Sequence, residues 1–414
     1  MKQALTVSAV REAEAAALAA TPDGALMDRA AAGLAVISAR WLQARRGGVS
    51  GSSVAVLAGA GNNGGDALFA AARLGARGAR VRVYALSESL HPLGAAAVLR
   101  SGGQIVNLAG LDPDSPVSVA AAEVVAAADL VLDGIVGIGG RGPLRPVAAK
   151  LARAARGRVI AVDLPSGVDP DTGAVADVDA CVAAEMTVTF GVLKTGLLLP
   201  PAARLAGLVS LVDIGLQPYL AGAPDALLMD LPTAGAAVPT PTASDDKYTR
   251  GVLGVVAGSE QYPGAGILCS GSARFGGVGM VRYAGGARAS VVTRWPEVVP
   301  SSELPSAAGQ AQAWVIGPGA GVDQVARDRL ADAVALEVPI VVDADAITLI
   351  AGSAELRAAL AARKAPTLLT PHEGEFARLG GDLSTPGGRL AAVRRLADEL
   401  CSVILLKGAV TLVS

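Results

Sequence analysis

Residues 54–66 read Val54-Ala55-Val56-Leu57-Ala58-Gly59-Ala60-Gly61-Asn62-Asn63-Gly64-Gly65-Asp66, a short apolar run followed by a glycine-rich loop. The apolar run is typical of a buried strand, and Ala67-Leu68-Phe69-Ala70 after the loop predicts a helix. Gly59, Gly61 and Gly64 have the G-x-G-x-x-G spacing, which lets the backbone approach a pyrophosphate at the start of the helix. A tight turn that binds no ligand would use the same glycines, so this spacing alone leaves both interpretations open.

Polar side chains in the same loop favour a ligand. Asn62, Asn63 and Asp66 are costly to bury without partners, so they indicate a polar ligand or an ion. Two later strand ends carry similar chemistry, in the loops 133–139 and 163–169. Oxygen ligands without sulfur or imidazole suit a hard cation, although an aspartate in such a loop often caps a helix or stabilises a turn. The oxygen-bearing side chains expected at one sheet edge are Asn62, Asn63, Asp66, Asp133, Asp163 and Ser166.

Short β-branched runs alternate with alanine-rich segments along most of the chain. This alternation predicts α/β domains with mostly parallel sheets, whose ligands bind beyond the carboxyl ends of the strands. Residues 8–46 read as a helix that Pro22-Asp23-Gly24 interrupts. The strands expected in the first half are 54–57, 81–84, 130–132, 159–162, 186–190 and 208–212. Those expected in the second half are 252–257, 290–293, 313–316, 340–342, 367–369 and 403–406.

Two domains are expected, because 414 residues exceed what one hydrophobic core usually covers. The proline-rich stretch 215–246 interrupts the alternation of strands and helices, and it therefore contains the boundary. We predict domains at 1–222 and 223–414.

Composition and charge exclude several classes of protein. Hydrophobic residues make up 52% of the chain, too many for disorder, and no apolar stretch approaches the roughly 18 residues of a membrane-spanning helix. A net charge of −2 offers no basic surface to nucleic acid or to an anionic membrane. Three cysteines without metal-type spacing and only two histidines argue against a disulfide framework and a multi-histidine metal site. We expect a soluble, cytoplasmic protein without nucleic-acid or membrane partners.

The combined motifs of roughly the first 215 residues resemble the epimerase domain of the NAD(P)H-hydrate repair proteins. The matching segments are Gly61-Asn62-Asn63-Gly64-Gly65-Asp66, 133–139 and 162–169, together with 11–14 and 26–30 of the opening helix. The resemblance implies a Rossmann-like, three-layer domain with a parallel sheet. It also implies that this domain binds hydrated NADH or NADPH and interconverts the R and S epimers.

The same resemblance implies roles for individual residues. Asp163 would contact the hydrated nicotinamide and serve as the catalytic acid or base. A potassium ion would be held by Asn63, Asp133 and Ser166. The residues implied to contact the nucleotide are Asn62, Asn63, Gly64, Gly65, Asp66, Gly137, Ile138, Gly139, Gly140, Arg141, Gly142 and Pro143. Ile138 stands where the family usually has threonine, which removes a hydroxyl that would contact phosphate.

The second half shows the same order of elements, in which a strand is followed by a polar or glycine-rich loop and then by a helix. The loops that close its expected strands are 258–265, 317–321, 343–346, 370–375 and 407–411. They should line one sheet edge, although the first of them could be a plain crossover turn. His372 could equally be a structural hydrogen-bonding residue, since a lone histidine often is. Lys407 could meet a phosphate or remain solvated.

Together these segments resemble the ADP- or ATP-dependent NAD(P)H-hydrate dehydratase, a ribokinase-like fold that often follows the epimerase in one chain. The resemblance implies that the hydrate is contacted by Ala265, Gly319, Gly321 and His372. It implies that ADP or ATP with magnesium is bound by Lys407, Gly408, Ala409, Val410 and Thr411. We also expect the protein to form a homo-oligomer. The family's G-x-G-D signature does not occur before Ser414. We therefore expect an incomplete dehydratase domain that turns over poorly.

Two other functions stay open on the residues alone. An NAD(P)-dependent oxidoreductase would use the same glycines, and it would need an acidic ribose-binding residue about 20 residues further on, where Glu88 stands. A non-catalytic nucleotide sensor would use the second half as a degenerate kinase-like domain. Absorbance change with an alcohol or acid substrate would favour the first, and nucleotide binding without turnover would favour the second.

Overall fold

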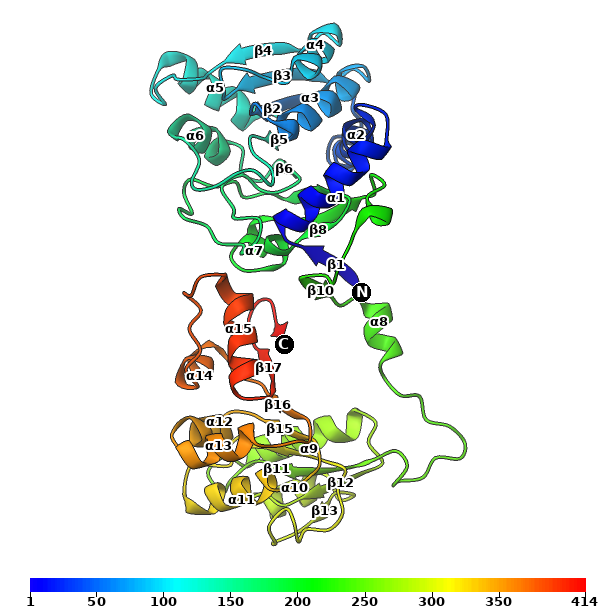
Figure 1. The fold of residues 1–414 in the computed structure, drawn as a ribbon, viewed down its shortest axis with the longest axis vertical. Coiled ribbons are helices and arrows are strands. Elements are labelled where there is room, and N and C mark those ends of the chain that lie inside the picture. The colour runs from blue at the N-terminus through cyan, green and yellow to red at the C-terminus, as the bar shows by residue number, and fades with distance from the viewer. The chain divides into compact units, whose positions relative to one another are not determined.

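The computed structural model describes residues 1–414, which fold into two compact units, Met1–Gly235 and Ala236–Ser414 (Figure 1). Both units combine helices with a mainly parallel sheet, which confirms the predicted α/β class. The division follows Gly235 because β10 (Ala226–Leu228) still pairs with β1 (Lys2–Leu5) of the first unit. The predicted boundary after residue 222 therefore lies before the last strand of that unit.

The sheet of the N-terminal unit has seven parallel strands in the order β4-β3-β2-β5-β6-β7-β9. Their bounds are β2 Ser53–Ala58, β3 Arg80–Ala85, β4 Gln104–Asn107, β5 Leu130–Gly134, β6 Val159–Val162, β7 Met186–Phe190 and β9 Leu208–Val212. Register pairs Ala58, the last residue of β2, with Ala85 and with Gly134. The loops after these strands therefore meet at one edge of the sheet.

Helices cover both faces of this sheet, which gives the three layers expected of a Rossmann-like domain. They are α1 Val7–Ala20, α2 Ala25–Arg46, α3 Asn62–Gly75, α4 Pro92–Arg100, α5 Pro116–Ala127, α6 Pro146–Ala154 and α7 Ala202–Leu205. Side chains alternate along β2, so that Val56 packs with α2 and α3 in one apolar core while Leu57 packs with α5 and α6 in the other.

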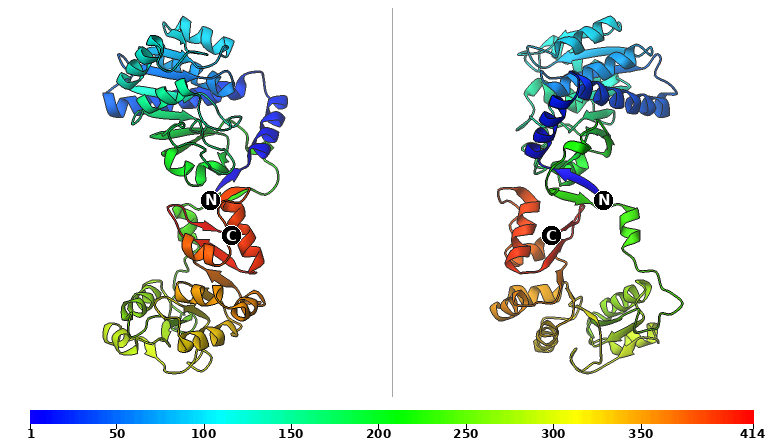
Figure 2. Two further views of the ribbon diagram at one scale, coloured as in Figure 1. Left: turned by 90° about the vertical axis from the view of Figure 1, so that its left-hand side faces the viewer. Right: turned by 45° about the vertical axis from the view of Figure 1, so that its right-hand side comes forward.

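The N-terminal segment reaches the edge of the domain where the glycine loop lies. Helix α1 begins after the N-cap Thr6, and α2 begins after Gly24, so the expected break at 22–24 is confirmed. Figure 2 shows that these two helices, the blue segments, run in different directions. Strand β1 pairs with β10 and with β8 (Leu193–Lys194), which leads into the 3-10 helix Thr195–Leu198.

The C-terminal unit has an eight-stranded sheet in the order β13-β12-β11-β14-β15-β16-β17-β18, parallel except for β18. Its strands are β11 Val252–Val256, β12 Met280–Tyr283, β13 Val299–Pro300, β14 Ala313–Ile316, β15 Ile340–Val342, β16 Thr367–Leu369, β17 Val403–Leu406 and β18 Leu412–Val413. Its helices are α9 Pro263–Phe275, α10 Arg288–Arg294, α11 Gln324–Val334, α12 Asp345–Ala351, α13 Ala354–Ala361, α14 Glu373–Arg378 and α15 Gly388–Glu399. The short α8 Leu231–Ala236 joins the two units.

One predicted strand is wrong. Residues 290–293 read Ser-Val-Val-Thr, which favours a strand by composition, but they belong to helix α10. Val291 is fully buried against the core of this unit, and the surrounding residues follow the helical period. Packing has overridden β-propensity here. Strands β4 and β12 were not predicted, since each is short and only partly buried.

Candidate functional site

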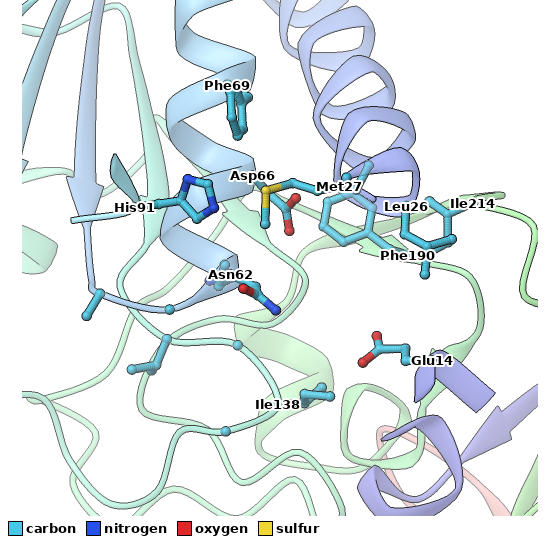
Figure 3. Close-up of a pocket in the computed structure, with 18 of the residues that line it drawn as sticks. Glu14, Leu26, Met27, Asn62, Asp66, Phe69, His91, Ile138, Phe190 and Ile214 are labelled. Carbon is cyan, nitrogen blue, oxygen red and sulfur yellow. The ribbon is translucent and has the colours of Figure 1, made fainter. Parts of the chain in front are cut away.

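A cavity of about 900 Å³ opens at the carboxyl ends of β2 and β5, beside α1, α2 and α3 (Figure 3). Its polar wall includes Arg11, Glu14, Asn62, Asn63 and Asp66. Its apolar wall includes Leu18, Leu26, Met27, Phe69, Phe190 and Ile214. A space of this size, with a few convergent polar groups among apolar ones, is typical of a site for a large small-molecule ligand.

The glycine loop is held by close backbone contacts. A Cβ at Gly59 would collide with the carbonyl oxygen of Ile135, and a Cβ at Gly64 would collide with the carbonyl oxygen of Gly59. Gly61 is the N-cap of α3 and makes no side-chain cap bond, so the first N–H groups of this helix have no side-chain acceptor at the N-cap. Such N–H groups and the positive end of the helix dipole suit an anionic ligand.

Gly64→Ala is expected to destabilise this loop by about 1–3 kcal/mol, because the added methyl group has no room against the backbone of Gly59. Gly61→Ala is the matched control, since no heavy atom lies within 4 Å of its ideal Cβ and its φ is −83°. Hydrogen exchange of peptides covering α3 would measure both effects. Equal protection in the two variants would contradict the packing argument.

Asp163 follows β6 and forms a buried ion pair. Its Oδ1 lies 2.5 Å from the Nζ of Lys194 and accepts a hydrogen bond from Thr189 Oγ1 at 3.0 Å. The lysine is 1% exposed and also donates to Thr189 Oγ1 and to the carbonyl oxygen of Phe190. Asp163 has φ 66°, a left-handed conformation that costs about 1–3 kcal/mol in a non-glycine residue and is often found at functional sites. Asp163 is not among the residues that line the cavity.

Two carboxyl groups face the cavity directly. Figure 3 shows Asp66 on α3 and Glu14 on α1 pointing into it from opposite sides. Burial, and then the charges of Asp163 and Glu14, raise the pKa of Asp66 well above its ordinary value. Burial also raises the pKa of Glu14, although Lys194 partly opposes this shift. Both groups therefore hold a proton more tightly than exposed carboxyl groups do.

Asp133, Ser166 and Asn63 form a group of oxygen donors below the glycine loop. Asp133 is fully buried and accepts hydrogen bonds from the Ser166 N–H at 2.8 Å and from Ser166 Oγ at 2.7 Å. Burial raises the pKa of Asp133 to about 6, against the hydrogen bonds from Ser166 and Ile135. The side-chain nitrogen of Asn63 is buried without a partner, and the oxygen of the same amide faces Gly137.

This donor set fits a monovalent hard cation. It supplies one carboxylate that pairs with no lysine or arginine, and its remaining donors are neutral oxygens. The chain contains no group of three or more histidine, cysteine, aspartate or glutamate side chains placed so that they could hold a metal ion together.

The loop after β5 borders the cavity opposite the helix start. Gly137, Ile138, Gly139 and Gly140 line the cavity, whereas Arg141 lines a smaller hollow beside it. Ile138 also packs against the small apolar cluster around Leu5, Val10 and Val192, which gives its apolar side chain a structural role. Gly142 and Pro143 continue the loop and do not line either space.

Three features of this site were missed by sequence reasoning. Lys194 was not identified, although a single lysine inside the apolar run 190–199 signals a buried charge that needs a partner. Glu14 was identified only as part of a matching helix segment, and nothing in its spacing distinguishes it from Glu12. The apolar wall around Phe69 and Met27 depends on how α2 and α3 pack.

Glu88 is exposed and does not line the cavity, so it does not serve as a ribose-binding residue there.

In the C-terminal unit, the predicted residues follow the carboxyl ends of neighbouring parallel strands. Ala265 and Gly319 come together, since a Cβ at Gly319 would lie 2.7 Å from the Cβ of Ala265. The Gly321 N–H donates to Asp345 Oδ2 at 2.9 Å. The loop that carries Gly408, Ala409, Val410 and Thr411 joins β17 to β18.

His372 and Lys407 both make protein contacts in this unit. The Nδ1 of His372 accepts hydrogen bonds from the N–H groups of Gly374 and Glu375, so His372 is the N-cap of α14 and its imidazole has a structural role. Its side chain stays 54% exposed, and the other ring nitrogen, Nε2, lies 3.5 Å from Glu375 Oε1. The Nζ of Lys407 lies 2.8 Å from Asp343 Oδ1 and 3.8 Å from Glu375 Oε2. The positive charge of Lys407 is therefore balanced by the carboxylates of Asp343 and Glu375 in this structure.

Comparisons with known proteins match the two units separately and together. A family model described as "YjeF-related protein N-terminus" matches residues 23–196, and one described as "NAD(P)H-hydrate dehydratase" matches residues 253–414. A protein of Mycobacterium tuberculosis named "Bifunctional NAD(P)H-hydrate repair enzyme Nnr" is 47% identical over 421 residues, covering 100% of this chain and 82% of the relative. The protein of the same name from Mycobacterium leprae is 46% identical over 424 residues, with the same coverage.

Solved structures show partial likeness. An ADP/ATP-dependent NAD(P)H-hydrate dehydratase from Bacillus subtilis aligns with a TM-score of 0.35 and 24% identity, covering 44% of this chain and 67% of that one. No helix in the chain combines the length and the apolar character that crossing a bilayer requires.

Proposed function

The chain belongs to the bifunctional NAD(P)H-hydrate repair enzymes, and from this premise we propose where on the molecule each half of the repair takes place. It is an enzyme of metabolite repair that joins an epimerase, which is an isomerase, to a dehydratase, which is a lyase. We assign epimerisation of the R and S hydrates of NADH and NADPH to Met1–Gly235. We assign nucleotide-dependent dehydration of the S hydrate to Ala236–Ser414.

The cavity of the N-terminal unit is the proposed epimerase site. The substrate's diphosphate would lie against residues 62–66, on the first free N–H groups of α3, and against the loop 137–143. The apolar wall formed by side chains such as Phe69 and Phe190 would hold the rings. What supports this assignment is the joint presence of an uncapped helix start, a glycine loop and an apolar wall in one space.

Asp163 is the proposed catalytic carboxylate. Its carboxylate, held by the ion pair with Lys194, can accept a proton or stabilise positive charge that develops on the substrate ring. The strained backbone at Asp163 supports a functional role. Asp163 lies beside rather than in the cavity wall, close enough that its charge acts on both Glu14 and Asp66 of that wall.

A potassium ion is the proposed occupant of the oxygen donors at Asn63, Asp133 and Ser166. The carboxylate of Asp133, which pairs with no lysine or arginine, and the amide oxygen of Asn63, which faces Gly137, support this assignment. A bound cation would supply a positive charge that neutralises Asp133 and fixes the loops after β2 and β5. The hydrogen bond from the Val136 N–H to Ser166 Oγ and the close backbone contacts of Gly59 and Gly64 would then hold the glycine loop in the conformation that receives the diphosphate.

In the C-terminal unit we propose that Ala265, Gly319, Gly321 and His372 contact the hydrate. ADP or ATP with magnesium would be bound near 407–411. Lys407 would have to exchange its contact with Asp343 for one with a phosphate, since it pairs with that carboxylate in this structure. The family match over residues 253–414 supports this assignment.

The assignment is tested with the purified chain and both epimers of hydrated NADH, in KCl or in choline chloride at equal ionic strength, with or without ADP or ATP and Mg²⁺. We expect exchange between epimers that is faster in potassium, because a cation neutralises Asp133. Recovery of NADH absorbance on adding nucleotide would report the dehydratase. No exchange above the enzyme-free rate would refute the epimerase site, and exchange that is indifferent to potassium would refute the cation site alone.

We also propose a cytoplasmic homo-oligomer. The exposed apolar side chains Leu268 and Phe275, which are 72% and 79% exposed on α9, offer surface that association would cover. Light scattering of the purified chain would give the oligomeric state, and a monomer at micromolar concentration would contradict the proposal.

A further inference from the structure

We propose that Glu14 and Asp66 are the paired acid and base of the epimerase, each serving one face of the hydrated ring. This inference rests on the proposed epimerisation and adds to it two catalytic residues with separate stereochemical roles. Only Asp66 lies within the glycine-loop motif, and Glu14 lies on a helix that precedes the matched segment 23–196.

The reaction itself requires chemistry on two faces. In the hydrate, the hydroxyl sits on a ring carbon next to the ring nitrogen. Proton donation to this hydroxyl lets the carbon–oxygen bond break, with its electron pair leaving in a water molecule while the nitrogen lone pair forms a C=N⁺ bond. A second water then adds to the opposite face and gives up a proton. Inversion therefore consumes one proton on one face and releases one on the other.

The geometry supplies one carboxyl group for each face. Glu14 extends from α1 and Asp66 from the N-terminal part of α3, and both point into the cavity from opposite sides (Figure 3). A flat ring between them would present one face to each. Neither group forms an ion pair, and Oδ1 of Asp66 is buried without any hydrogen-bond partner. A buried, unpartnered oxygen is costly unless a ligand completes it.

Protonation also suits these roles. Burial raises the pKa of both Glu14 and Asp66, so that each holds a proton more readily than an exposed carboxyl group and can give it to the departing hydroxyl. Asp163 differs, because Lys194 contacts it at 2.5 Å. In this proposal the ion-paired Asp163 stabilises the C=N⁺ cation, while the two unpaired carboxyl groups exchange protons.

The test uses the full chain in H₂¹⁸O with one pure epimer of hydrated NADH at a time. Inversion is followed by chromatography and ¹⁸O uptake by mass spectrometry, each corrected for the enzyme-free rate. In the unmodified chain, every inversion should introduce one ¹⁸O. Glu14→Gln should slow inversion about 100-fold or more, yet retain ¹⁸O exchange without inversion into one epimer. Asp66→Asn should slow inversion similarly and retain exchange into the other epimer.

Glu12→Gln is the matched control, because Glu12 lies on the same helix but bonds to Ser8 and does not line the cavity. It should invert at the unmodified rate. Unmodified inversion in Glu14→Gln, retained exchange into the same epimer in both variants, or loss of all exchange in both would overturn the two-face assignment. If the unmodified chain itself fails to invert the hydrates, the proposed epimerase function fails instead, and the two failures are thus distinguished.

Discussion

Substitution of Asp163 by asparagine is expected to lower the rate of epimer exchange by about 10²- to 10⁴-fold. The change keeps the size and the left-handed backbone that asparagine tolerates, but it removes the negative charge beside the cavity. Without that charge the positive ring formed during the reaction loses its electrostatic partner. The measurement is kcat for conversion of one pure epimer into the other, at saturating substrate and constant potassium.

Asp177→Asn is the matched control for this substitution. Asp177 lies in the same long connection between β6 and β7, is exposed, and bonds only locally to the Asp179 N–H. Its replacement should leave kcat unchanged. If Asp163→Asn retained a tenth or more of the unmodified rate in a folded protein, Asp163 would be a structural partner of Lys194 rather than a catalytic carboxylate.

The sequence predicts the fold of this protein well wherever local and tertiary signals agree. The strands β2, β5, β6 and β7 are buried β-branched runs, and each is followed by a turn-forming loop, so pattern and packing point to the same structure. The failure at residues 290–293 has the opposite cause. Their composition favours a strand, but Val291 packs its side chain into the core from a helix.

The sequence predicted those residues of the candidate site that lie in recognisable motifs, but not the residues that only the tertiary structure brings to it. Strand order brings the residues of the glycine loop and those after β5 and β6 to one edge, as the parallel alternation implies. The ion pair between Asp163 and Lys194 joins residues 31 positions apart, and no local pattern encodes it. The inward direction of Glu14 depends on how α1 lies against the domain, which the periodicity of one helix does not determine.

Lys194 provides the second large expected effect, this time on stability. Its three donors are satisfied by Asp163 Oδ1, Thr189 Oγ1 and the Phe190 carbonyl oxygen, and its side chain is 1% exposed. Lys194→Met leaves the carboxylate of Asp163 largely buried without its cation. We expect the free energy of unfolding of the N-terminal unit to fall by about 3–5 kcal/mol.

The double variant Asp163→Asn, Lys194→Met separates the structural from the catalytic part of this ion pair. With neither charge present, no unpaired ion is buried, so the double variant should recover most of the stability that Lys194→Met loses. Epimer exchange should stay as low as in Asp163→Asn, because the charge that stabilises the ring cation is still missing. Hydrogen exchange of peptides covering β7 and β8 in the full chain would report stability locally. If the double variant is as unstable as Lys194→Met, the lysine stabilises the unit through its bonds to Thr189 and Phe190 rather than by neutralising Asp163.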